Sequence, residues 1–167
     1  RVSGDRTMKI RSATLADREG LSRLTAEVHE LHREARPDVY MKFDPEQFRK
    51  EISDTLYRPD SILLVAEEEG ELAGMALLTL RQPSNPILKP RLYAFLEELS
   101  VGERFRGQGI GTALFTAAKE QALKRGAVSL ELQVWSFNEA ALRFYEKMGM
   151  KEKTFRMELP LQKGESR

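Results

Sequence analysis

The sequence contains no cysteine and only two histidines, His29 and His32. A chain without cysteine forms no disulfide, builds no thiolate zinc site and offers no cysteine nucleophile. It also lacks any apolar run near the roughly 20 residues that a membrane-spanning helix needs, and no signal-like segment lies near its N-terminus. These absences favour a protein of the cytoplasm that does not act at a membrane.

Positive and negative charges are almost equal, with 27 lysines and arginines against 26 acidic residues. Such a chain has no overall field to hold nucleic acid or an acidic membrane, so neither is an expected partner. The length of 167 residues and the hydrophobic content of 41% predict one globular domain. We expect this domain over residues 8–162, with a disordered extension or expression remnant at 1–7 and a flexible tail at 163–167.

Capping and turn residues divide the domain into alternating strands and helices. Thr14 begins a first helix through a capping box, and Asp44 caps a second helix before Pro45. A third helix follows a glycine-rich stretch, with Leu123 among its inward side chains, and Asn138 caps a fourth. Strands are predicted over residues 8–11, 61–67, 71–80, 92–101, 128–135 and 154–159.

The stretch "RFRGQGIGTAL", residues 104–114, places three glycines between a strand and a helix. Backbone N–H groups at the positive end of a helix bind anions, and glycine lets a phosphate approach closely. A phosphoryl-transfer loop would need a lysine after Gly111, where Thr112 stands. The dinucleotide fingerprint would need a third glycine in place of Thr112. A ligand whose phosphates are only a handle therefore fits best.

Residues 106–112, "RGQGIGT", resemble the pyrophosphate loop of the GNAT N-acetyltransferase superfamily, Arg/Gln-x-x-Gly-x-Gly/Ala. "LEELSVGERFRGQGIGTAL" resembles that family's fourth strand, loop and third helix, and "LELQVWSFNEAALRFYEKMGM" resembles its fifth strand and fourth helix. The resemblance implies an α/β (α+β) single domain. Its mixed central sheet would have about six to seven strands and about four helices, and would be splayed between the fourth and fifth strands.

The resemblance also implies an activity, in which an amine directly attacks the thioester of acetyl-CoA without a covalent enzyme intermediate. A polyamine or an amino-sugar antibiotic is the expected acceptor class. A protein N-terminus, a lysine side chain or a non-catalytic acyl-CoA-binding role are alternatives, and a homodimer is left open. By resemblance the backbone of Leu99 and Val101 contacts the thioester and the pantetheine. The other implied cofactor contacts are Arg106, Gly107, Gln108, Gly109, Ile110, Gly111, Thr112, Asn138 and Ala141.

Tyr145 is the proton donor that the resemblance implies for the departing thiolate; its alternative role is a core tyrosine. Relatives that acetylate protein N-termini carry a glutamate where Gln133 stands, and an amide cannot act as a base. Glu97 interrupts the apolar face of its strand, so we expect a buried carboxylate with a raised pKa that serves as the base. A solvated or ion-paired carboxylate is the alternative, and Glu98 and Glu131 rank below it.

The segment "LHREARPDVYMKFD" lies where acceptor specificity usually resides in the superfamily. Its aromatic and acidic residues suit a small cationic amine. The histidines are three positions apart and no third ligand is visible, so no metal site is expected. A solvated histidine pair is the leading expectation, with substrate contact as the alternative. The residues concerned are His29, His32, Asp38, Tyr40, Phe43 and Asp44.

Overall fold

The computed structural model describes residues 7–161, so most of the expected extension and the expected tail lie outside the described residues. The chain divides into two compact units, Arg1–Gln133 and Val134–Arg167, and each is described by itself. The single domain over residues 8–162 stays a prediction. No helix among residues 7–161 is long and apolar enough to cross a membrane.

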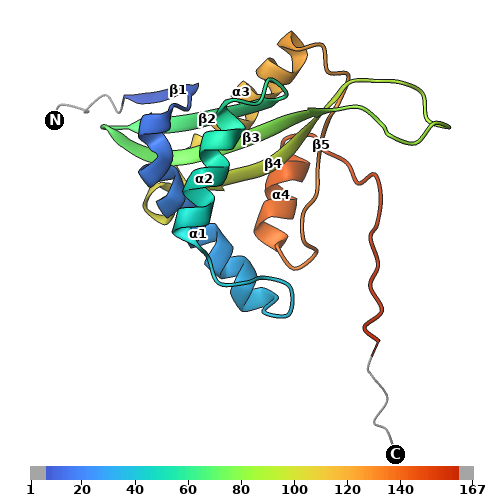
Figure 1. The fold of residues 1–167 in the computed structure, drawn as a ribbon, viewed down its shortest axis with the longest axis horizontal. Coiled ribbons are helices and arrows are strands. Elements are labelled where there is room, and N and C mark those ends of the chain that lie inside the picture. Colours follow the sequence, from blue (N-terminus) through green and yellow to red (C-terminus); the bar gives the residue numbers. More distant parts are fainter. Residues whose placement is uncertain (1–6, 162–167) are drawn as a thin grey trace, which may run out of the picture. The chain divides into compact units, whose positions relative to one another are not determined.

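The first unit contains a five-stranded sheet in the order β1-β2-β3-β4-β5 (Figure 1). The first four strands pair antiparallel, and β4 pairs parallel with β5. Glu69 and Gly70 both have positive φ, 52° and 80°, which closes the predicted hairpin between β2 and β3 with a tight turn. The strands are β1 (Met8–Ser12), β2 (Ser61–Glu68), β3 (Glu71–Arg81), β4 (Tyr93–Val101) and β5 (Leu130–Leu132).

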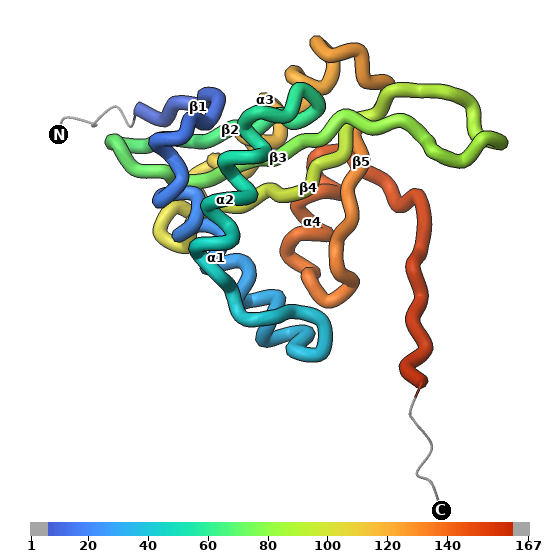
Figure 2. The backbone as a smooth tube through the Cα atoms, in the orientation of Figure 1, coloured from blue at the N-terminus to red at the C-terminus, as the bar shows by residue number. Residues whose placement is uncertain are grey.

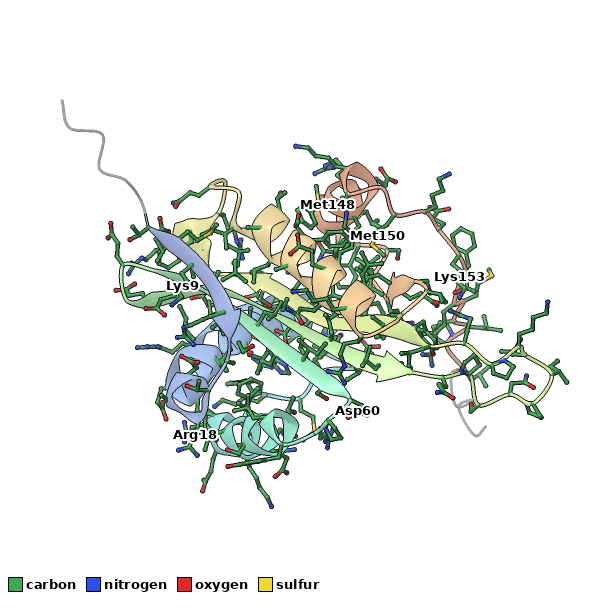
Figure 3. The ribbon with its side chains drawn as sticks, turned by 90° about the horizontal axis from the view of Figure 1, so that it is seen from above. Lys9, Arg18, Asp60, Met148, Met150 and Lys153 are labelled. Carbon is green, nitrogen blue, oxygen red and sulfur yellow. The ribbon has the colours of Figure 1, made fainter. Side chains whose placement is uncertain are left out.

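Three helices of the first unit cover the two faces of this sheet. Helices α1 and α2 lie on one face and α3 lies on the other, as Figure 3 shows with the sheet nearly edge-on. Leu21 of α1 and Ile52 of α2 are buried in one core cluster with Leu63, Val65 and Met75 of the sheet. Figure 2 traces the same backbone as a tube. The helices are α1 (Arg18–Ala35), α2 (Pro45–Leu56) and α3 (Ile110–Lys124).

Local sequence signals account for where these helices begin. The capping box of Thr14 and Asp17 forms a short 3-10 turn that leads into α1. The side chain of Asp44 accepts hydrogen bonds from the backbone of Glu46 and Gln47, with Pro45 in the first turn of α2. Both predicted helix starts are confirmed.

Strand β4 contains a bulge at Glu97. Leu77 of β3 is paired with Glu98 and the next residue, Leu78, is paired with Leu96, so Glu97 is the extra residue. Paired residues in an antiparallel ladder share a face. Glu98 therefore lies on the face of Leu77, which is the face that packs against α1 and α2.

In the second unit, α4 (Glu139–Lys147) is capped by the side chain of Asn138, which accepts a hydrogen bond from the backbone N–H of Ala141 at 3.2 Å. Gly149 follows the helix with φ 93°, as its predicted end requires. The predicted helix and its cap are therefore confirmed.

The fold class is as expected, but some details differ. The described residues form five strands, not six to seven, because residues 154–159 have no regular secondary structure. Strand β5 is also shorter than the predicted range 128–135. Alternating apolar residues say which face of a strand would be buried, but a strand also needs a hydrogen-bonded neighbour. Leu123 is 65% exposed because it lies in the last turn of α3, where the helix is ending.

Candidate functional site

The loop from β4 to α3 presents a bare helix N-terminus. Gly107 and Gly109 adopt left-handed backbone conformations, with φ 74° and 82°, and a Cβ at either would meet open space. Gly109 is the N-cap of α3, no side chain caps this end, and no acidic residue lies in the first turn. Because the first N–H groups of a helix have no partner within it, this end offers several donors and a positive dipole to an anion.

The two arginines that flank this loop have different surroundings. Arg104 is ion-paired with Glu71 at 2.7 Å and stacks over the Phe105 ring. Arg106 is exposed, and its Nε lies 3.5 Å from the carbonyl oxygen of Val101. Arg104 is thus held by an acidic partner, whereas the contact of Arg106 is with a backbone carbonyl oxygen.

The second half of β4 has an edge with no strand beside it in residues 7–133. Strand β5 is only three residues long and pairs with Ala94–Leu96, so β4 has no paired strand on this side after Leu96. Gly102 donates its N–H to the carbonyl oxygen of Ala73 in β3 at 2.8 Å. Since backbone groups alternate in direction along a strand, Leu99 and Val101 direct theirs away from β3. This edge can accept an extended ligand as an added strand.

Helix α3 is held against the sheet at Gly74 of β3, a residue that we did not single out in the sequence. A Cβ there would lie 2.7 Å from the carbonyl oxygen of Ser100 and 2.8 Å from Leu114 of α3. Ile110 is also buried at this contact, so only its backbone N–H can face a ligand. A glycine inside a predicted strand was the available signal, because it marks a close backbone approach.

Glu97 does not have the burial that we expected. It is exposed and ion-paired with Arg81, and its Oε1 also accepts a hydrogen bond from the hydroxyl of Thr79. The alternative interpretation, an ion-paired strand carboxylate, describes it better. Glu131 is likewise ion-paired, with Arg91 at 2.9 Å.

Glu98, the neighbour that we ranked lower, has the environment expected of a base. Burial raises the pKa of its carboxyl, against the smaller lowering effects of a hydrogen bond from Ser100 and the charge of His29. The Ser100 hydroxyl lies 2.9 Å from Glu98 Oε1. A carboxylate with a raised pKa, beside polar groups and near a helix that can contact substrate, is a candidate for proton transfer.

The segment after α1 folds back on that helix through aromatic contacts. The His29 ring lies 5.7 Å from Tyr40 and 5.5 Å from Phe43, and the His32 ring stacks on Tyr40. Burial lowers the pKa of His32. Both histidines are half-buried and engaged in ring contacts, so neither is a fully solvated side chain; no metal-binding cluster is found among residues 7–161.

Both acidic residues of this segment have structural partners. Asp38 is ion-paired with Arg36 at 2.7 Å, which lowers its pKa, and Asp44 caps α2. Neither supports the expectation that these two carboxylates receive an amine. Within this unit Glu98 is the better candidate for that contact.

In the second unit, Tyr145 is partly buried on α4, and burial raises the pKa of its phenol to about 12. The phenol therefore carries its proton at neutral pH, as a donor must. Its ring packs edge-to-face against Phe144. Asn138 and Ala141 form the N-terminal cap described above, which accounts for Asn138 without a ligand.

The mixed sheet, the unpaired second half of β4 and the bare N-terminus of α3 fit the acyltransferase fold that the sequence predicts. A family model described as "Acetyltransferase (GNAT) family" matches residues 25–150, and the chain belongs to this family. The fold and family expected from the sequence are therefore confirmed.

Individual relatives agree with this assignment. The chain is 33% identical to the uncharacterized N-acetyltransferase YhfO of Bacillus subtilis, over 88% of this chain and 92% of the relative. It is 38% identical to the uncharacterized N-acetyltransferase MJ1207 of Methanocaldococcus jannaschii, over 58% of this chain but only 42% of that protein. A crystal structure of a mutant BH1408 protein from Bacillus halodurans is 31% identical and superposes with a TM-score of 0.87, covering 92% of this chain and 99% of that one.

Proposed function

We propose that the protein transfers an acetyl group from acetyl-CoA to a small primary amine by direct attack of the amine on the thioester. The bare N-terminus of α3, with Gly107 and Gly109 in left-handed conformations, is the observation that carries this proposal. Its N–H groups would bind the diphosphate of the cofactor, and Arg106 would add a cationic contact. Because the diphosphate does not react, the loop needs no lysine.

The edge of β4 would hold the rest of the cofactor. Val101 would pair with the pantetheine arm, and the N–H of Leu99 would donate to the thioester oxygen. That donation stabilises the negative charge that develops on the oxygen when the amine nitrogen bonds to the carbonyl carbon. The direction of both backbone groups, away from β3, supports this arrangement.

Glu98 is our proposed base, in place of Glu97. A lysine-like amine has a pKa of about 10.4, so it arrives as an ammonium and must lose a proton. The raised pKa of Glu98 makes this carboxylate a stronger base than an exposed one. The ion pair of Glu97 with Arg81 argues against that residue. The rings of Tyr40 and Phe43 would bound the acceptor near His29.

Tyr145 is proposed to assist the departing sulfur when the carbon–sulfur bond breaks. An ordinary thiol has a pKa of about 8.5, well below the value of about 12 for this phenol. Full proton transfer from the phenol to the thiolate would therefore be uphill. A hydrogen bond from the phenol, which stabilises the thiolate, is the role that these values support.

A thiol-release assay over a panel of amines tests the function. Acetyl-CoA would be incubated with polyamines, amino sugars, amino acids and peptides, and product mass would be checked for acetylation. We expect turnover with at least one small amine. No peptide should be acetylated at a comparable rate. Preference for peptide N-termini would overturn the acceptor class. Cofactor binding without turnover on any amine would identify a non-catalytic acyl-CoA-binding protein.

A further inference from the structure

A pocket of about 210 Å³ lies between the tip of the β2–β3 hairpin and the start of the loop that leads to α3. We call it the hairpin pocket. Three of its six lining residues are glutamates and one is an arginine, so the pocket carries a net negative charge. It is lined by Glu68, Glu69, Glu71, Arg104, Phe105 and Gln108.

Glu68 is the unexplained group in this pocket. The residue is only 8% exposed, and its buried Oε2 has no hydrogen-bond partner among the residues that the structure describes. A buried carboxylate oxygen without a donor is costly, and native proteins almost always supply a partner. The neighbouring glutamates do not share this problem, because Glu71 is ion-paired with Arg104 and Glu69 is exposed at the turn.

The existing contacts of Arg104 indicate which ligand chemistry the pocket accepts. Its guanidinium lies 4.9 Å from the centroid of the Phe105 ring and 2.7 Å from Glu71. An aromatic face beside carboxylates is the usual environment of an organic cation. A bare metal ion fits less well, since no group of three or more possible metal ligands occurs in residues 7–161.

We propose that the hairpin pocket binds an organic cation with N–H donors, a guanidinium or primary ammonium group, whose charge is balanced by Glu68. Because Oε2 of Glu68 is enclosed in the ligand-free protein, its side chain would turn to present this oxygen to the cation, which would donate a hydrogen bond to it and lie beside the guanidinium of Arg104. This site is separate from Glu98, which lies on the sheet face that packs against α1 and α2. Its occupation does not depend on the acetyl-transfer reaction.

The test is a titration of isotope-labelled protein followed by amide chemical shifts, at constant ionic strength. The probes are methylguanidinium, methylammonium, tetramethylammonium and magnesium chloride. We expect saturable shifts centred on residues 68–71 and 104–108 with at least one of the first two probes. Tetramethylammonium, which has no N–H, and magnesium should give none. Shifts that do not saturate, or equal shifts with tetramethylammonium or magnesium, would overturn the proposal.

Variants show whether Glu68 is the group responsible. Glu68→Gln keeps the size of the side chain and should weaken binding at least tenfold, as expected when a charged hydrogen bond is lost. Glu98→Gln, on the other face of the sheet, should bind within about twofold of the parent. Loss of binding in Glu98→Gln with retention in Glu68→Gln would place the cation elsewhere and overturn the proposal.

A second variant keeps the proposal testable if Glu68→Gln fails to fold. Arg104→Gln removes the guanidinium that neutralises Glu71 and so makes the pocket more negative. We expect it to bind the cation severalfold more tightly than the parent does. Unchanged or weaker binding in Arg104→Gln would contradict the assignment.

Discussion

The two faces of the sheet in residues 7–133 differ in the groups that they place near the second half of β4. Under α3 the contact is tight, because Gly74 leaves no room for a Cβ between Leu114 and the carbonyl oxygen of Ser100. Under α1 and α2, the polar side chains of Glu98 and Ser100 lie beside buried apolar ones. One face fixes the position of the helix that follows the glycine loop, and the other holds a carboxylate whose pKa is raised by burial.

The largest expected effect separates the two adjacent glutamates of β4. Glu98→Gln should lower kcat/KM about a hundred- to a thousandfold, because the amine loses its base. Glu97→Gln, its matched control, should remain within about threefold of the parent, since it removes only an exposed ion pair. Steady-state kinetics on the best amine would measure both. The reverse order of effects would restore Glu97 as the base.

A smaller loss is expected at Tyr145. Tyr145→Phe should lower kcat about ten- to a hundredfold, because one hydrogen bond to the developing thiolate is lost. The dissociation constant of coenzyme A, measured by calorimetry, should change less than threefold by the same reasoning, since that bond forms only as the sulfur departs. Unaltered turnover would remove the phenol from the mechanism.

The tight packing under α3 can be tested through stability. Gly74→Ala should lower the free energy of unfolding by about 1–3 kcal/mol, because the added methyl group overlaps backbone and Leu114 atoms. Gly107→Ala should cost about 1 kcal/mol, since its Cβ meets open space and only the left-handed conformation is penalised. Denaturant unfolding gives both values. Equal losses would contradict the difference that we draw between the two glycines.

The pH profile should show the smallest change. Because burial raises the pKa of Glu98, the acid limb of kcat/KM should lie above the ordinary glutamate value, with activity falling as pH drops through the raised pKa. In Glu98→Gln this limb should disappear while the residual rate stays measurable. An acid limb that persists in the variant would assign it to another group.

Much of this arrangement could be predicted from the sequence because its causes are local. The glycine loop, the caps at Asp44 and Asn138 and the hairpin at Gly70 each depend on a few neighbouring residues. The choice between Glu97 and Glu98 could not be predicted from neighbouring residues, because the bulge that distinguishes them arises from the pairing of β4 with β3. A glycine within β3 was a visible signal that we passed over.

Two further expectations lack support in the structure, the first for a local reason and the second for a non-local one. Asp38 and Asp44 had the charge to receive an amine, but an arginine and a helix N-terminus already occupy them. The alternating pattern of residues 154–159 has the period of a strand, yet Phe155 and Met157 remain 80% and 92% exposed. An alternating apolar pattern predicts which face of a strand would be buried. The neighbouring element that buries this face must come from the rest of the fold.

The account depends most on the claim that the N-terminus of α3 binds a diphosphate. Calorimetric titration with coenzyme A and with pantetheine, which lacks the diphosphate together with the phosphorylated adenosine that it carries, tests it. We predict one site for coenzyme A and binding of pantetheine at least about a hundredfold weaker, because several N–H donors and Arg106 lose their partner. Equal affinity for the two compounds, or no binding of coenzyme A, would contradict the claim.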